Sequence, residues 1–434
     1  MTVREVIPRG YRHRLARWKR WLVGLLLPGW LAGQTAAGFE RWWWFEPGLE
    51  HGNPMPNRRF RVNAPEAVLH PKFGSRNETF SSGMMQIRMP EDPRLLEGAD
   101  LYLELWGGHP GTANKRVTIN GRSTYAIAEV GTASKHCTHQ YPVIRLKPSD
   151  LVNGYNALQF ACDQGTTFWG HFIVDNACLR ARLKPDHPDL VAAGLVGFAA
   201  AVEARPHQSE RMVLELRATA PERIAGVDYQ GYYRGYNENG AIEPFTWHGF
   251  TKHRRPEAYL GRATEAPFRI VWDQSMLPAQ EGAAVRAIVH FREFANLVYT
   301  TAPLEGLRIP PRPDHVVELY PARELPAPFW SRAGRRQHAT IDLDVEPERI
   351  ERAELHIVLW DGGRGSVEHP VTLNGHPVPA AGEGEHDVLY RRLEIEPRLL
   401  RRSGNRVEIF SDTEHHGIEV LLPGPALMIR ARAR

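Results

Sequence analysis

The stretch LYLELWGGHPGTANKRVTING at residues 101–121 decides the fold, because it occurs a second time as LHIVLWDGGRGSVEHPVTLNG at residues 355–375. Each copy has an alternating run that ends in Trp (Trp106, Trp360), a Gly-rich turn, a second short run and an Asn-Gly pair. Alternation predicts a strand, and Asn-Gly after a strand predicts a tight hairpin. Because the spacing from Trp to Asn-Gly is the same in both copies, the chain carries one folding unit twice.

Short strand patterns separated by turn signals continue on both sides of each copy. Strands are predicted at 84–89, 143–146 and 157–162, and the Pro-containing turn at 148–156 has a counterpart at 397–405. Many short strands at such spacing are typical of antiparallel sandwiches. The predicted fold class is therefore all-β.

The order of these features resembles the galactose-binding-domain-like jelly rolls. The copies differ in one detail, since Gly and Asn are separated by one residue at 154–156 and adjacent at 404–405. The resemblance implies two jelly-roll domains, at 60–185 and 311–434. Jelly rolls of this kind are accessory modules on many bacterial carbohydrate-active proteins.

Residues 186–310, between the copies, carry a different pattern. The order Pro-Phe-x-Ile-x-Trp-Asp, Pro-x-Gln and Val-Arg-Ala resembles bacterial immunoglobulin-like domains, in which the Trp packs between sheets. An insertion at 235–256 is rich in Tyr, Trp, His and Arg, and it could form an aromatic platform or fill a contact between domains. The apolar run at 190–201 is too short to span a bilayer and predicts a buried strand pair or a short helix.

The first residues have the order of a secretory signal. A basic stretch at 10–20 precedes an apolar run at 21–32 and small residues at 35–37. This order predicts a signal peptide at 1–37, with a retained anchor or a misassigned start codon as alternatives. A loosely structured leader at 38–59 is expected to follow, with no integral membrane span after removal of the signal. The predicted location is secreted, periplasmic or at the cell surface.

Composition narrows the function classes. A charged fraction of 24% with a net charge of +4 is ordinary for a globular protein, and no stretch interleaves clustered Arg with exposed aromatic residues over a plausible groove, so nucleic-acid binding is not expected. The sequence has no HExxH, Walker, GxSxG or GxGxxG motif. Cys137, Cys162 and Cys178 allow one disulfide and one remaining thiol, with the pairing left open. No metal site or cofactor is predicted, and a structural calcium ion is left open.

One candidate site lies in DTEHHGIEVLLPGP at 412–425. His416 and Glu419 could act as acid and base there, and Tyr390 could complete a lyase-type pair with His416. Adjacent His residues on a strand point to opposite faces, so they do not easily share a metal. The alternative is a structural turn before a closing strand, with one His buried against Trp360.

A sugar site is predicted from aromatic and His side chains in the loop at 135–141 and in the insertion. Aromatic rings stack on sugar rings, and His side chains supply directional hydrogen bonds. The alternative is that these side chains fill the core, decorate loops or pack between domains. The candidate ligand-binding residues are His109, His139, Tyr141, Trp169, His171, Trp247, His248 and His415.

Together these features predict an exported, non-catalytic protein that binds carbohydrate or polysaccharide. One alternative is a polysaccharide-acting enzyme, a glycoside hydrolase or lyase, with its site between a jelly roll and the immunoglobulin-like domain. A hydrolase needs two carboxylates at one site, and Asp273 with Glu238 or Asp361 with Glu419 could be named. A second alternative is a structural or assembly protein of the cell envelope.

Overall fold

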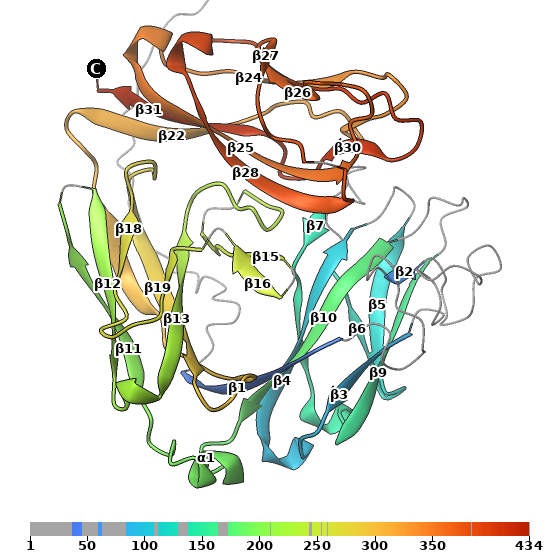
Figure 1. The fold of residues 1–434 in the computed structure, drawn as a ribbon, viewed down its shortest axis with the longest axis vertical. Helices are drawn as coiled ribbons and strands as arrows, with labels where there is room; N and C mark the ends of the chain where they lie inside the picture. Colours follow the sequence, from blue (N-terminus) through green and yellow to red (C-terminus); the bar gives the residue numbers. More distant parts are fainter. Residues whose placement is uncertain are drawn as a thin grey trace, which may run out of the picture. The chain divides into compact units, whose positions relative to one another are not determined.

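The computed structural model describes residues 37–45, 60–62, 84–107, 112–128, 138–163, 172–208, 210–242, 245–252, 254–257, 259–382 and 384–433. These residues form antiparallel strands, joined by short 3-10 turns and one α-helix, α1 (Pro188–Ala192) (Figure 1). The all-β prediction is confirmed, whereas the run at 190–201 holds only the last three residues of α1 and the first two of a strand that begins at Ala200, with turns between them. No helix among the described residues has the length and apolar character needed to cross a membrane.

The largest sheet has twelve strands in the order β14-β13-β19-β20-β1-β10-β4-β7, with β17, β21, β2 and β8 paired beside this path. Its strands are β1 (Gly38–Trp44), β2 (Phe60–Val62), β4 (Leu96–Trp106), β7 (His139–Gln140), β8 (Val143–Leu146), β10 (Phe172–Leu183), β13 (Ile224–Tyr233), β14 (Thr246–Trp247), β17 (Gly261–Ala263), β19 (Gln280–Phe291), β20 (Leu297–Thr300) and β21 (Leu304–Ile309). It runs without interruption from the first copy of the repeat into the middle segment.

Strand β1 makes this continuity. It pairs with β10, where Trp44 lies opposite Cys178, and with β20, where Gly38 lies opposite Thr300. The sequence predicts a loosely structured leader at 38–59, whereas residues 38–44 form a regular strand with partners on both sides. The physical reason is alternation, because Phe39 enters the core while the next residue faces the other side of the sheet. Residues 46–59 lie outside the described residues.

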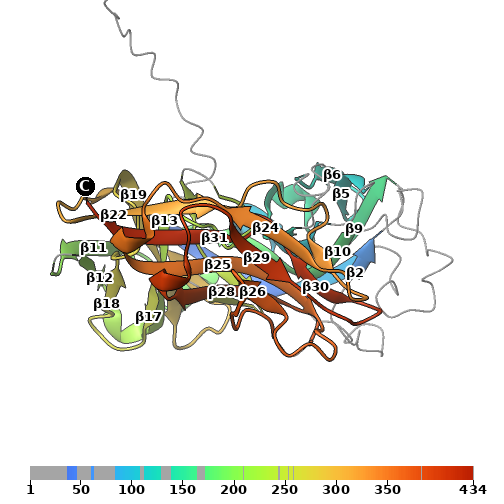
Figure 2. The ribbon, with the colours of Figure 1, turned by 90° about the horizontal axis from the view of Figure 1, so that it is seen from above.

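Five smaller sheets complete the described structure. In the first copy, one sheet contains β3 (Met84–Met89), β9 (Gly154–Asp163), β5 (Ala113–Ile119) and β6 (Ser123–Ala126). In the middle segment, one sheet contains β11 (Ala200–Pro206), β12 (Arg211–Ala218) and β18 (Ile270–Asp273), and another contains β15 (Phe250–Lys252) and β16 (Arg255–Glu257). In the second copy, one sheet contains β22 (His315–Pro321), β31 (Ala426–Arg432), β25 (Ile350–Gly362), β30 (Gly417–Val420), β23 (Trp330–Ser331) and β28 (Asp387–Ile395), and another contains β24 (Gln337–Ile341), β29 (Asn405–Ile409), β26 (Val371–Leu373) and β27 (His376–Pro377). Figure 2 shows β22, β31, β25 and β28 side by side. Most buried apolar side chains between Phe39 and Ile309 form one contiguous core, and most of those between Phe329 and Ala431 form a second. A third cluster contains residues from both ranges, among them Trp106, Phe250 and Val358.

The Asn-Gly turns of the repeat have the same structure in both copies. Asn120 has φ 50° and Asn374 has φ 53°, which is the left-handed region that Asn tolerates in a hairpin turn. The side-chain nitrogen of Asn120 donates to Asn156 Oδ1 at 2.8 Å, and that of Asn374 donates to Asn405 Oδ1 at 3.0 Å. Each Asn also accepts a backbone N–H from the neighbouring strand. These residues therefore fix the fold in both copies.

Candidate functional site

Glu104 is a buried acid on the face of β4 that points away from the core. The leucines at 101, 103 and 105 enter the core, so the residues between them face the opposite side. The Glu104 side chain is 5% exposed, and its Oε1 atom has no hydrogen-bond partner among the described residues. Burial raises the pKa of Glu104 to about 8, and the negative charge of Asp175 adds to this effect. A carboxyl group with this pKa is protonated at neutral pH and can donate a proton.

Asp175 reaches the same face through a β-bulge in β10. Val174 lies opposite Leu105 and Asn176 lies opposite Glu104, which leaves Asp175 as an extra residue between two paired positions. A bulge of this kind changes the direction of a side chain and is common beside active sites. Here it adds a second carboxylate next to Glu104 on a neighbouring strand.

His139, a predicted ligand-binding residue, holds the Asp175 carboxylate. It lies on β7 opposite Trp106, and its Nε2 atom is 2.7 Å from Asp175 Oδ2. The His139 side chain is 5% exposed, and its Nδ1 atom has no hydrogen-bond partner among the described residues. The contact fixes the direction of the carboxylate, as a second carboxylate in an acid–base site requires.

The insertion at 235–256 covers part of this site. Phe250 of β15 packs on Tyr141, with ring centroids 5.6 Å apart, and Tyr141 lies parallel to Tyr102 at 6.3 Å. Burial raises the pKa of Tyr102 and of Tyr141 well above the usual tyrosine value, so both phenols stay neutral. Arg254 donates to the carbonyl oxygen of Phe45 at 2.8 Å. The covering side chains exclude water from Glu104, which explains its raised pKa.

Tyr390, a predicted catalytic residue, lies on β28, where the second copy of the repeat contacts the insertion. Its ring packs in a cluster with Tyr236 and Phe250, and its hydroxyl is 2.9 Å from Nδ1 of His356. The pair proposed with His416 is not formed, because the His416 ring packs 5.9 Å from that of Trp360. Tyr390 is therefore placed as a packing residue with a satisfied hydroxyl.

The two adjacent histidines lie in the bend before β30. His415 and His416 are both exposed, and His416 has φ 72°, so they are on a turn rather than within a strand. Glu419 is 7% exposed on β30, opposite Trp360 of β25. His416 lies near Trp360, but it is exposed, whereas the structural alternative for this segment has a buried histidine there.

The two carboxylate pairs named from the sequence differ in their surroundings. Glu238 accepts from His248, whereas Asp273 accepts from the backbone N–H of Ser275 at 2.9 Å, so each carboxylate has a separate partner. Asp361 is 2% exposed and accepts from the backbone N–H of Gly384 at 2.7 Å.

His248 and Trp247 of the insertion have different environments. The His248 side chain is 2% exposed, with Nδ1 3.1 Å from Glu238 Oε2 and Nε2 3.1 Å from the carbonyl oxygen of Tyr233. Its ring stacks on Tyr233 at 3.9 Å, so this histidine is a satisfied packing residue. Trp247 is half-buried, and the guanidinium of Arg286 lies 4.1 Å from its ring centroid.

Other predictions fall partly on residues that the structure does not describe. His109, Trp169, His171 and Cys137 lie outside the described residues, as does the predicted signal peptide up to residue 36. Cys162 and Cys178 are both buried and are not joined to each other. Burial raises the pKa of the Cys178 thiol, which makes it unreactive.

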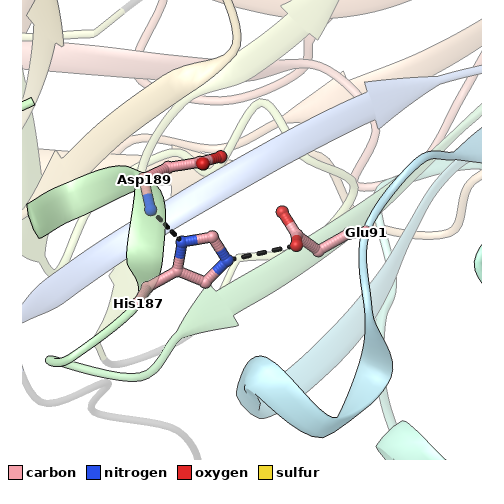
Figure 3. A group of neighbouring side chains, drawn as sticks. All are labelled: Glu91, His187 and Asp189. Atoms are coloured by element: carbon pink, nitrogen blue, oxygen red, sulfur yellow. Dashed lines mark hydrogen bonds and ion pairs between the residues drawn. The ribbon is translucent and has the colours of Figure 1, made fainter. Parts of the chain in front are cut away.

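Glu91, His187 and Asp189 are close enough to suggest a metal site. Figure 3 shows His187 with one ring nitrogen toward Glu91, at 3.1 Å, and the other accepting the backbone N–H of Asp189. Arg41 neutralises both carboxylates, since its guanidinium lies 2.7 Å from Glu91 and 2.6 Å from Asp189. A cation would have to displace Arg41, so the group ties β1 to α1 instead.

Glu104 and Asp175 are absent from the residues that the sequence singles out. Comparison of the repeat copies contains a signal for the first, because LYLELW places Glu104 where LHIVLW has Val358. A carboxylate at an otherwise apolar strand position requires a partner or a function. No equivalent signal marks Asp175, because a bulge depends on the pairing of distant strands.

No protein-family profile matches the sequence, and no curated protein matches it. The chain is similar to a beta-porphyranase of glycoside hydrolase family 86 from the human gut bacterium Bacteroides plebeius, with 14% identity and a TM-score of 0.23 over 54% of this chain and 37% of that chain. It is also similar to wild-type BuGH86 in complex with neoagarooctaose, with 10% identity and a TM-score of 0.24 over 60% of this chain and 36% of that one. The chain thus spans little more than a third of the length of either structure. TM-scores this low establish neither a common fold nor a common activity.

Proposed function

We propose that this chain is a polysaccharide-acting enzyme of the glycoside hydrolase class, with Glu104 as the general acid. The observation that carries the proposal is a buried carboxyl group with a raised pKa beside a second carboxylate, Asp175, on the adjacent strand. Two carboxyl groups at one site, one of them a proton donor, are the usual machinery for cleaving a glycosidic bond.

The chemistry follows from the two groups. Glu104 transfers its proton to the glycosidic oxygen as the bond from that oxygen to the anomeric carbon breaks. Asp175, oriented by His139, either attacks the anomeric carbon directly or removes a proton from the attacking water. In the first route water later hydrolyses the glycosyl ester, and Glu104 recovers its proton from that water. The anomeric configuration of the product distinguishes the two routes.

The face that carries Glu104 also carries aromatic side chains suited to sugar rings. Trp44 of β1 lies opposite Cys178 and meets the ring of Tyr102 edge-on at 5.8 Å. Trp42 follows on the same face, and both indoles are half-buried. Partly exposed indole rings stack on sugar rings. An exported location, predicted from residues 10–37, suits a polymeric substrate.

The test is turnover of a polysaccharide panel, read as new reducing ends. Glu104→Gln keeps the shape of the side chain but removes the proton, and Asp175→Asn removes the second charge. Each substitution is expected to reduce kcat by about 10²- to 10⁴-fold. Product formation by both variants at the wild-type rate would reject these roles, and no product from any polymer with the folded wild type would reject the enzyme.

Non-catalytic carbohydrate binding is the second candidate function, favoured by Trp42 and Trp44 on this face. It predicts that the wild-type chain binds a polysaccharide without releasing reducing ends and that Glu104→Gln leaves the affinity unchanged. The same panel therefore separates the two functions.

A further inference from the structure

The face of the large sheet that carries Glu104 continues across its central strands. Register places Arg180 of β10 opposite Trp42 of β1, while Arg286 of β19 lies opposite Gln230 of β13. The neighbours of these residues along each strand pack into or against the core: Leu179, Trp43 and Ala287. The two arginines are therefore on the same side of one sheet as the acid pair.

Arg286 is a half-buried cation with a neutral partner. Its Nε atom donates to Gln230 Oε1 at 2.9 Å, and its guanidinium lies 4.1 Å from the centroid of the Trp247 ring. It forms no ion pair with any residue that the structure describes. Burial lowers the pKa of Arg286 to about 10, and the nearby positive charge of Arg180 acts in the same direction. Burial and the charge of Arg180 both disfavour the charged form of Arg286, so an anion bound beside the guanidinium would stabilise that form.

Arg180 is held in a similar way. Its guanidinium lies 5.7 Å from the Trp42 ring centroid, and its Nε atom has no hydrogen-bond partner among the described residues. Its nearest carboxylate is that of Asp100, at 3.9 Å, which is a long ion-pair distance. An indole beside each guanidinium fixes its position while leaving its N–H groups able to bind a ligand.

The carboxylate of Glu40 also acts on Arg286, but its hydrogen bonds are to residues other than Arg180 and Arg286. It is buried on β1, and its Oε2 atom accepts from Trp42 Nε1 at 3.1 Å and from Thr300 Oγ1 at 3.5 Å. Its hydrogen bonds are therefore to neutral donors. Among the described residues, Arg286 therefore has no carboxylate at ion-pair distance, and Arg180 has Asp100 at 3.9 Å.

We propose that Arg180 and Arg286 bind an anionic group, a carboxylate or a sulfate, carried by a sugar residue of the polysaccharide. The proposal rests on the function proposed above and adds the substrate class. Guanidinium groups match the paired oxygens of both anions. Arg180 lies four residues along β10 from Asn176, the partner of Glu104, which corresponds to about 13 Å. The anionic sugar is therefore a different residue from the one whose bond is cleaved.

Binding is measured on the Glu104→Gln background, so that turnover does not consume the polymer. The probes are polygalacturonate, which carries carboxylates, carrageenan, which carries sulfates, and an uncharged galactan. One anionic polymer is expected to bind more tightly than the uncharged one, and its affinity is expected to fall with added salt. Arg180→Gln and Arg286→Gln are each expected to weaken that binding by at least about tenfold.

Arg217→Gln is the matched control, because Arg217 is 64% exposed on β12 in an ion pair with Glu203 and should leave binding unchanged. Arg286→Lys keeps the charge and should recover part of the affinity, which shows that the loss is not a folding defect. Equal affinity of the two glutamine variants and the background chain would overturn the proposal, as would equal binding of charged and uncharged polymers or binding of none.

The two proposals fail in different ways. Arginine-dependent binding of an anionic polymer with no product from the wild type would sustain the anion site and reject the enzyme. Cleavage of an uncharged polymer, unchanged by Arg180→Gln and Arg286→Gln, would sustain the enzyme and reject the anion site.

Discussion

The Nε2 atom of His139 lies 2.7 Å from the Oδ2 atom of Asp175, and this contact passes over β4, the strand that carries Glu104. The two residues come from the strands on either side of β4, so the three side chains meet only when all three strands are paired. The acid pair is thus a product of sheet assembly.

Replacing His139 should show whether its contact with Asp175 orients that carboxylate for catalysis. His139→Ala removes the side chain that holds Asp175, so kcat is expected to fall by about 10- to 100-fold with a small change in KM. The pH profile of kcat should also change, since the surroundings of the carboxylate pair change. The matched control is His376→Ala, which alters an exposed histidine of β27 and should leave both quantities at the wild-type value. A wild-type pH profile for His139→Ala would show that His139 does not act on Asp175.

The raised pKa of Glu104 predicts a pH-dependent effect on stability. The folded-state pKa of about 8 is above the ordinary value of 4.5, so the folded chain binds the proton more tightly. The protonated acid contributes stability that is fully present below about pH 4.5 and is lost as the pH rises through about 8. Glu104→Gln lacks this ionisation, so it should gain up to about 5 kcal/mol over the wild type between pH 4.5 and pH 9.

Denaturant unfolding of both chains at several pH values measures this gain. Glu203→Gln, at a 58% exposed side chain, is the control and should not gain stability relative to the wild type over the same range. Parallel stability curves for the wild type and Glu104→Gln would mean that Glu104 has an ordinary pKa.

Conservative replacement of Tyr390 should lower stability and leave turnover unchanged, whereas conservative replacement of Glu104 should lower turnover. Tyr390→Phe removes the hydroxyl that lies 2.9 Å from His356, so it should lower the free energy of unfolding by about 1 kcal/mol. Turnover should remain at the wild-type level because the hydroxyl is already used in a hydrogen bond with His356 of the same repeat copy. A hundredfold loss of kcat at unchanged stability would instead support the lyase-type role predicted from the sequence.

Strand β1 should be essential for stability. Phe39 is buried, and its ring lies 5.1 Å from that of Tyr299 and 5.8 Å from that of Phe198. Phe39→Ala should therefore cost about 3 to 5 kcal/mol of unfolding free energy. Val191→Ala, at a 59% exposed side chain, is expected to cost less than about 0.5 kcal/mol. Equal effects of the two substitutions would show that β1 is not part of the core.

The repeat made much of the fold predictable. Asn120 and Asn374 mark the same left-handed turn, and the match of their neighbours indicates strands on both sides. Strand β1 was not predictable in this way, because its partners lie far along the chain. Its Thr300–Glu40 contact joins residues 260 positions apart. Local alternation shows that a segment can form a strand but not which strands it joins.

The site was less predictable than the fold. His139 and Tyr141 were predicted as ligand-binding residues because aromatic and His residues cluster in one loop of the sequence, and both lie close to Glu104 in the structure. Asp175 needed knowledge of the bulge, which exists only in the pairing of β10 with β4. The pKa of Glu104 depends on burial, which the sequence around it does not encode.

The place of β1 in the large sheet also constrains the order in which the protein can fold. This strand leaves the ribosome before either of its partners, and β20 follows only after most of the chain has been made. The aromatic residues of β1 therefore stay exposed, and can pair incorrectly, until both partner strands have been synthesised. Strand β1 is thus among the first to be synthesised but enters the sheet late. A chaperone that binds the first part of the chain would therefore raise the yield of folded protein.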